Sequence, residues 1–168
     1  MLREEMEAAI TEYGDMLYRL AIVRTGNVEE AEDMVQQTFL KLVEHYESLE
    51  SPEHVKAWLI RVCCNGCSNL IKAPRKSRET DLEHVLMLLS DGVSQEDEVL
   101  KKLQHEQLWR EVYKLPEKYR TVLHLCYMEE YSPTEIAEIL KLNYNVVCVR
   151  LNRAKKKLAE CLKREDFL

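Results

Sequence analysis

The chain has 168 residues, of which 24 are Lys or Arg and 30 are Asp or Glu, so its formal net charge is −6. At roughly 100–200 residues per domain, this length allows one ordinary domain or two small ones. The hydrophobic fraction of 46 %, with 4 Gly and 4 Pro, excludes wholesale disorder and favours a helical protein. No stretch reaches the about 18 consecutive apolar residues of a membrane-spanning helix, and the acidic N-terminus is unlike a secretory signal. We therefore expect a cytoplasmic protein that does not insert into a membrane.

Three amphipathic helices are predicted within the first 72 residues. The first ends near Thr25-Gly26, because Gly can adopt positive φ, and Asn27 is a suitable N-cap for the second. Ser51-Pro52 opens the third, with Pro at the first helical position. The side chains expected to be buried are Ile10, Tyr13, Leu17, Leu20, Ala21, Ala31, Met34, Val35, Phe39, Leu42, Val43, Val55, Trp58, Leu59, Val62, Cys63 and Leu70. A polar ridge is expected on the opposite side of the third helix, formed by Arg61, Asn65, Ser68 and Lys72.

The apolar periodicity weakens between about 76 and 95, where we expect a linker with room for one short helix. Helical spacing resumes at Val99, and Leu115-Pro116-Glu117 marks another helix start. The apolar residues that follow are Tyr119, Val122, Leu123, Cys126 and Tyr127.

A helix-turn-helix is predicted near the C-terminus. Residues 132–135 (SPTE) form a capping box with Pro at the first helical position, and the helix that they open is short. Asn143 caps a longer basic helix, whose inward residues are Val147, Leu151, Ala154 and Leu158. In a DNA-binding helix-turn-helix, the second helix enters the major groove. The alternative is an ordinary helical hairpin with a charged face.

The outward residues at the start of this last helix are candidates for reading bases: Asn145, Cys148, Val149, Asn152 and Arg153. Asn and Arg side chains can make bidentate contacts to adenine and guanine, respectively. Lys155, Lys156 and Lys157 suit phosphates, which set affinity without reading sequence.

Charge is distributed very unevenly along the chain. Residues 1–53 hold 13 acidic and 4 basic residues, a net charge of −9, whereas residues 141–164 hold 8 basic residues and Glu160 alone, a net charge of +7. A second basic cluster follows the third helix and consists of Lys72, Arg75, Lys76 and Arg78. Such local patches indicate where nucleic acid would bind.

Six cysteines stand at positions 63, 64, 67, 126, 148 and 161, and without an export signal we expect reduced thiols. The Cys64–Cys67 spacing matches a redox or zinc site, but no second Cys or His pair lies at finger spacing. The competing interpretation makes Cys63 and Cys67 packing residues on one side of a helix. We predict no metal and no cofactor, and the chain lacks a P-loop, an H-E-x-x-H or a G-x-S-x-G motif, so we do not expect an enzyme.

Both halves of the chain resemble bacterial RNA polymerase sigma factors of the extracytoplasmic-function (ECF) group. Residues 31–42 (AEDMVQQTFLKL) are similar to region 2.2 of that family and residues 57–65 (AWLIRVCCN) to region 2.4. Residues 115–123 (LPEKYRTVL), 135–140 (EIAEIL) and 150–154 (RLNRA) are similar to region 4. The resemblance implies an all-α protein with two small helical domains, at 1–75 and 96–168, joined by a flexible linker at 76–95.

The resemblance also implies partners and a role for individual residues. The polymerase would be bound through its β′ clamp helices, at Asp33, Gln36 and Gln37, and through its β flap. The minus-ten promoter element would be bound by Arg61, Asn65 and Lys72, with Asn65 bordering the pocket for a flipped base. The minus-thirty-five element would be bound by Asn145, Cys148, Val149, Arg150, Asn152, Arg153 and Lys156. An anti-sigma factor is expected as a further partner. The competing functions are a stand-alone helix-turn-helix regulator and a thiol redox or zinc protein.

Overall fold

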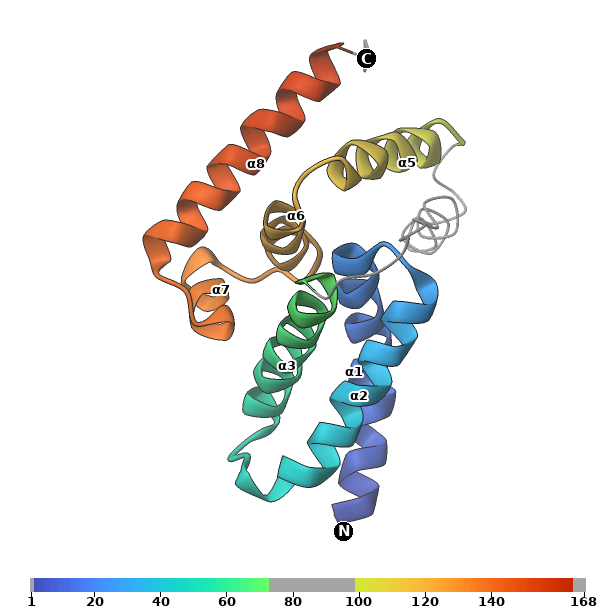
Figure 1. Ribbon diagram of the computed structural model, residues 1–168, viewed down its shortest axis with the longest axis vertical. Helices are drawn as coiled ribbons and strands as arrows, with labels where there is room; N and C mark the ends of the chain where they lie inside the picture. Colours follow the sequence, from blue (N-terminus) through green and yellow to red (C-terminus); the bar gives the residue numbers. More distant parts are fainter. Residues whose placement is uncertain (1, 73–98, 165–168) are drawn as a thin grey trace. The chain divides into compact units, whose positions relative to one another are not determined.

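The computed structural model describes residues 2–72 and 99–164, and the regular secondary structure in these ranges is entirely helical, with no strand. The chain divides into two compact units, Met1–Glu79 and Thr80–Leu168, each with its own core. The predicted all-α fold is therefore confirmed (Figure 1). The expected linker at 76–95 and the basic residues Arg75, Lys76 and Arg78 lie outside the described residues.

The first unit is a three-helix bundle in which each helix packs against the other two (Figure 1). Helix α1 spans Leu2–Thr25, α2 spans Val28–His45, and α3 spans Pro52–Lys72, with a 3₁₀ turn at Tyr46–Ser48. The predicted boundaries are confirmed by their hydrogen bonds. Gly26 has φ 67°, Asn27 Oδ1 accepts from Glu30 N at 3.0 Å, and Ser51 Oγ accepts from His54 N at 3.2 Å.

The core of this unit contains most of the predicted apolar stripe, and Leu17, Leu20, Leu42 and Leu59 are fully buried. Gly66 explains how closely α3 approaches α2. A Cβ atom at this position would lie 2.9 Å from Met34 Sδ, so a side chain here would force Met34 to move. The missing side chain thus offsets the roughly 1 kcal/mol that Gly costs within a helix.

Three predicted orientations in the first unit are wrong. Ile10 and Val43 are exposed rather than buried, because they lie at the edge of the α1–α2 contact where no third element covers them. Ser68 is half-buried, because it accepts a hydrogen bond from the buried guanidinium of Arg24 on α1.

The second unit contains α5 (Val99–Tyr113), α6 (Glu117–Leu123), α7 (Pro133–Leu140) and α8 (Tyr144–Arg164). Helix α6 continues directly into a π-helical turn, His124–Met128, that the sequence pattern did not predict. Helix α8 packs against α5, α6 and α7, and therefore organises this unit. The apolar side chains that fill its core include Val122, Leu125, Ile136, Val147 and Ala154.

The π-helical turn changes which side chains are buried. A regular helix through Val122 and Leu123 would continue the apolar stripe to Cys126 and Tyr127, but the wider turn shifts the register. Tyr127 is 58 % exposed and Cys126 is half-buried, so neither residue continues the apolar stripe into the core. The buried residues of the turn are His124 and Leu125, and His124 Nε2 lies 3.4 Å from Glu129 Oε1.

None of the helices in the described ranges combines the length and apolarity that crossing a bilayer requires.

Replacing fully buried Leu59 by Ala should lower the free energy of unfolding of the first unit by about 2–5 kcal/mol, because it opens a cavity in the bundle. The matched control is Leu40→Ala, which should change it by less than about 0.5 kcal/mol, because Leu40 is 65 % exposed. Urea unfolding followed by tryptophan fluorescence measures both in a Trp109→Phe background, where Trp58 reports on this unit alone. Equal effects of the two substitutions would contradict the assigned core.

Candidate nucleic-acid interface and apolar surfaces

Helix α7 begins with the predicted capping box. Ser132 Oγ accepts from Glu135 N, and Glu135 Oε1 accepts from Ser132 N, both at 3.2 Å. Pro133 occupies the first helical position, where a backbone N–H would have no partner within the helix, so the missing N–H of Pro costs no hydrogen bond. This reciprocal cap allows a helix of only eight residues to start at a defined place.

The turn after α7 is closed by backbone hydrogen bonds. Leu142 N donates to Ala137 O at 2.9 Å, and Lys141 N donates to Glu138 O at 3.4 Å, which together form a Schellman motif. Lys141 has φ 54° and ψ 45°, a left-handed conformation that usually belongs to Gly. Asn143 Oδ1 then accepts from Asn145 N at 2.8 Å, so the predicted cap of α8 is confirmed.

The burial of Val147, Leu151 and Ala154 fixes the orientation of α8. Five of the residues predicted to bind DNA are exposed: Asn145, Val149, Asn152, Arg153 and Lys156. The other two, Cys148 and Arg150, are half-buried. Cys148 is hydrogen bonded to Tyr144, and this bond raises the pKa of the Tyr144 phenol. The sequence pattern missed Val146, which is exposed beside Val149.

Two of the lysines of α8 lie against aromatic rings of their own unit. Lys155 Nζ is 5.5 Å from the centre of the Tyr127 ring, and Lys157 Nζ is 5.2 Å from that of Tyr119. A hydrogen bond to Tyr127 raises the pKa of Lys155, so this side chain keeps its positive charge. Lys156 lies on the outward side of α8, one turn after Arg153 and Asn152.

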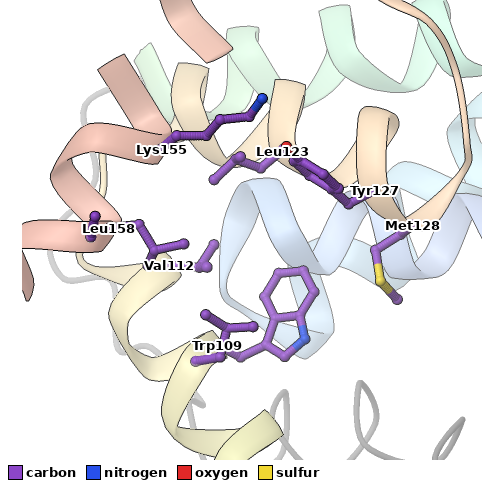
Figure 2. A pocket seen from close by; sticks show the side chains of 9 residues that line it. Trp109, Val112, Leu123, Tyr127, Met128, Lys155 and Leu158 are labelled. Carbon is purple, nitrogen blue, oxygen red and sulfur yellow. The ribbon is translucent and has the colours of Figure 1, made fainter. Parts of the chain in front are cut away.

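An apolar pocket of about 370 Å³ opens between α5, the α6–π-helical segment and α8 (Figure 2). Trp109 and Val112 come from α5, Leu123 from α6, and Leu158 from α8, while Tyr127 and Met128 stand at the exposed side. We call this the α5–α8 pocket. It was not predicted, because the π-helical turn that places Tyr127 and Met128 there leaves no mark on the apolar periodicity.

A second apolar surface lies along α1 and α2, and we call it the α1–α2 surface. It surrounds a cavity of about 460 Å³ lined by Ile10, Gly14, Val35, Gln36, Phe39, Leu40 and Val43. Of the polar residues predicted to bind a partner here, Gln36 lines the cavity, and Asp33 and Gln37 are exposed elsewhere on α2. Leu40 was missed. The signal in the sequence is that residues 39, 40, 42 and 43 are all apolar, which is more than one face of a helix can bury.

A small open pocket of about 220 Å³ lies where the 3₁₀ segment meets α3, and we call it the Trp58 pocket. Its lining residues are Ser48, Leu49, Glu50, His54, Ala57, Trp58 and Arg61. Trp58 is half-buried, and its ring centre is 5.8 Å from that of His45. The structure thus brings Arg61 next to an aromatic ring. Asn65 is exposed one turn further along α3, and Lys72 ends that helix with its side chain outside the described residues.

The cysteines of α3 are packing residues, as one of the two interpretations predicted: Cys63 and Cys67 are fully buried. A hydrogen bond with Cys67, together with burial, raises the pKa of Cys63 well above its usual value. The thiol therefore stays protonated, which is the unreactive form. Within the described ranges, no group of three or more His, Cys, Asp or Glu side chains could hold a metal ion.

Comparison with known protein families gives a match in each unit. Residues 9–77 match the family described as Sigma-70 region 2, and residues 105–158 match the family described as Sigma-70, region 4. The first match contains the α1–α2 surface and the Trp58 pocket. The second contains the helix-turn-helix and all but the last residue of the α5–α8 pocket.

Two relatives from Bacillus subtilis are similar over most of their length. The ECF RNA polymerase sigma factor SigW is 31 % identical over 159 residues, which cover 90 % of this chain and 85 % of SigW. The RNA polymerase sigma factor SigV is 32 % identical over 158 residues, which cover 94 % of this chain and 91 % of SigV.

Solved structures show the same fold. The sigma factor RpoE of Bartonella quintana, determined with the anti-sigma factor NepR, has a TM-score of 0.68 at 22 % identity and covers 95 % of this chain and 98 % of its own. CnrH, determined with the cytosolic domain of CnrY, has a TM-score of 0.65 at 21 % identity. The match covers 96 % of this chain and 90 % of CnrH.

Replacing Ser132 by Ala should lower the free energy of unfolding of the second unit by about 1 kcal/mol, because the N–H of Glu135 loses its partner. The matched control is Thr134→Ala in the same helical turn, where the exposed side chain should contribute less than about 0.5 kcal/mol. Urea unfolding in a Trp58→Phe background, with Trp109 as the reporter, measures both. A loss of equal size at Thr134 would mean that helix propensity, not the cap, determines the effect.

Proposed function

The chain belongs to the ECF group of the sigma-70 family of RNA polymerase sigma factors, and from this membership we propose how its two units divide the work. A sigma factor binds core RNA polymerase in the cytoplasm and directs promoter recognition, DNA melting and transcription initiation. Bond formation belongs to the core enzyme, so this chain supplies binding surfaces and no catalytic group.

The observation that carries the proposal is the helix-turn-helix formed by α7 and α8. Its second helix buries one apolar face and presents amide, guanidinium and ammonium groups on the other. Residues 141–164 carry a net charge of +7, whereas residues 1–53 carry −9. Duplex DNA attracts residues 141–164 and repels residues 1–53, so we assign the duplex to α8 rather than to the N-terminal helices.

The α1–α2 surface is proposed to bind the clamp helices of the polymerase β′ subunit. Leu40 and Val43 supply exposed apolar area, and Asp33, Gln36 and Gln37 supply polar contacts near it. An apolar centre with a polar rim is the usual arrangement of a specific protein interface. Asp33, Gln36 and Gln37, which the sequence predicted as contacts, keep that role in this proposal. The centre of the interface is formed by the apolar side chains of Leu40 and Val43.

The α5–α8 pocket is proposed to receive an apolar side chain of the polymerase β flap. Its walls are almost entirely apolar, and Tyr127 and Met128 extend the apolar surface to its mouth (Figure 2). Together with the α1–α2 surface, it gives each unit its own contact with the core enzyme.

The Trp58 pocket is proposed to hold an unstacked base of the minus-ten element. Single-stranded bases are commonly held by stacking on aromatic rings and by cationic groups near the backbone. Trp58 supplies the ring and Arg61 the cation. Asn65 and Lys72 follow at intervals of four and seven residues on α3, where the strand would continue.

The first turns of α8 are proposed to read the minus-thirty-five element in the major groove. Asn145, Asn152 and Arg153 are exposed there and can form hydrogen bonds with base edges. Arg150 and Lys156 are assigned to phosphates. Cys148 is directed along the side of the helix toward Tyr144, so its contribution is to position that ring.

An anti-sigma factor is proposed as a further partner. The structural neighbour RpoE was determined in complex with the anti-sigma factor NepR. The apolar α1–α2 surface and the α5–α8 pocket are the natural targets, because covering them prevents polymerase binding.

The test is reconstitution. Purified chain is added to core RNA polymerase with promoter fragments selected from a library randomised at both elements, and run-off transcription is measured. The expected result is initiation that depends on this chain. Binding of an operator as a dimer without polymerase, with no initiation, would identify a stand-alone regulator instead.

In that assay, Leu40→Asp should weaken core polymerase binding about 10- to 100-fold, because it places a charge at the apolar centre of the α1–α2 surface. The matched control is Ala8→Asp, which adds the same charge at an exposed position of α1 nearly opposite Ile10. Fluorescence anisotropy with labelled core enzyme measures both affinities. Equal losses would mean that net charge, not the apolar contact, determines binding.

Arg153→Ala should weaken holoenzyme binding selectively, by about 1–3 kcal/mol for promoters that carry the preferred base pair at one upstream position. Lys156→Ala should weaken all sequences alike and lower the salt dependence by roughly one ion. Binding to a panel of single-base-pair variants at several salt concentrations separates the two effects. A uniform loss from both substitutions would show that Arg153 contacts phosphate.

A further inference from the structure

Two valines stand on the exposed face of α8 where a DNA-reading helix would carry hydrogen-bonding groups. Val146 is 38 % exposed and Val149 is 44 % exposed, and both lie within the first two turns. At a spacing of three residues, their side chains are neighbours on the helix surface. Nothing in the packing of the second unit requires apolar residues at these positions, because Val147 and Leu151 supply the buried face.

The neighbours of the valines are polar or cationic. Asn145 lies one turn before Val149, and Arg153 lies one turn after it, and both are exposed. Lys156 continues the same side of the helix. The Tyr144 side chain is hydrogen bonded to Cys148, on a different side of α8, and therefore does not cover the valines. An apolar spot within such a cationic face suits a polyanion that itself presents apolar groups.

We propose that Val146 and Val149 contact the C5-methyl groups of thymines in the minus-thirty-five element, so that part of promoter recognition depends on methyl groups rather than hydrogen bonds. This inference rests on the proposed function, which places α8 in the major groove. The thymine methyl is the apolar group that unmodified base pairs expose in that groove. Against any other base, valine would cover donors or acceptors and leave them without partners.

A protein partner is the other kind of molecule that could cover two exposed valines. The position of the valines favours DNA, because they lie between Asn145 and Arg153 in the segment 141–164, whose net charge is +7. The apolar surfaces assigned to protein partners lie elsewhere, at the α1–α2 surface and the α5–α8 pocket.

The experiment removes the methyl group and nothing else. A promoter fragment selected by the holoenzyme is synthesised twice, with thymidine or with deoxyuridine in the minus-thirty-five element, and with unmodified DNA everywhere else. Holoenzyme made from core polymerase and the full chain is then titrated against both fragments. Each contacted methyl should account for about a fourfold difference in affinity, the value expected for burying one such group.

Val146→Ala and Val149→Ala, singly and together, provide the variants. Both valines are exposed, and Ala favours the helix, so folding should be retained and is checked by thermal unfolding. The ratio of thymidine to deoxyuridine affinities should fall toward one in the double variant. Lys156→Ala is the matched control: it should weaken binding to both fragments and leave their ratio unchanged.

Equal affinity of the wild-type holoenzyme for the two fragments would overturn the proposal, and so would an unchanged ratio in the double variant. Weaker core polymerase binding by the double variant, with the ratio unchanged in the holoenzyme that still forms, would overturn the proposal and identify the valines as a protein-docking surface. In each of these outcomes the wild-type holoenzyme still initiates on the unmodified promoter, whereas failure of that initiation overturns the proposed function and this inference together.

Discussion

The burial of Val147, Leu151 and Ala154 is the constraint on which the DNA-binding half of the molecule depends. These residues hold α8 against the other helices of its unit, and a helix with 3.6 residues per turn has no freedom to rotate once one face is buried. The opposite face, centred on Val149, is then determined. The Schellman turn at Lys141 serves the same end, because it sets where α8 starts and therefore which residues occupy its first turns. A left-handed lysine costs about 1 kcal/mol relative to Gly, and two backbone hydrogen bonds offset it.

The separation of charge between the N-terminal helices and α8 determines which part of the chain can hold duplex DNA. A single domain with the same composition would present mixed charges to DNA, and the acidic residues would cancel part of the attraction. Placing the acidic excess in the three-helix bundle leaves the helix-turn-helix cationic at short range, where a Debye length of about 8–10 Å limits the reach of distant charges. The chain as a whole can therefore be acidic, with a net charge of −6, and still hold duplex DNA.

Features of the fold that are set by local chemistry could be predicted from the sequence. The caps at Asn27, Ser132 and Asn143 depend on side chains bonding to backbone a few residues away, and all three are present. The errors arise where tertiary packing decides. Val43 has helical spacing like its buried neighbours but faces no covering element, and Tyr127 follows a π-helical turn that shifts the register. Most of the predicted polar contacts lie at exposed positions, but the apolar surfaces beside them could not be inferred from periodicity.

The exposed apolar side chains connect these points. Eight large ones occur in the described ranges, and seven of them fall into three groups: Ile10, Leu40 and Val43 on α1 and α2; Tyr127 and Met128 at the α5–α8 pocket; and Val146 and Val149 on α8. The eighth, Tyr144, lies on another side of α8 and is hydrogen bonded to Cys148. Scattered apolar residues on a protein surface need no explanation, but clustered ones indicate contact with another molecule. Each group lies at a surface to which we have assigned a contact that a sigma factor makes, namely polymerase binding for two and promoter binding for the third. The residues that violate the amphipathic pattern therefore carry more information about function than those that obey it, because packing within the chain does not account for them.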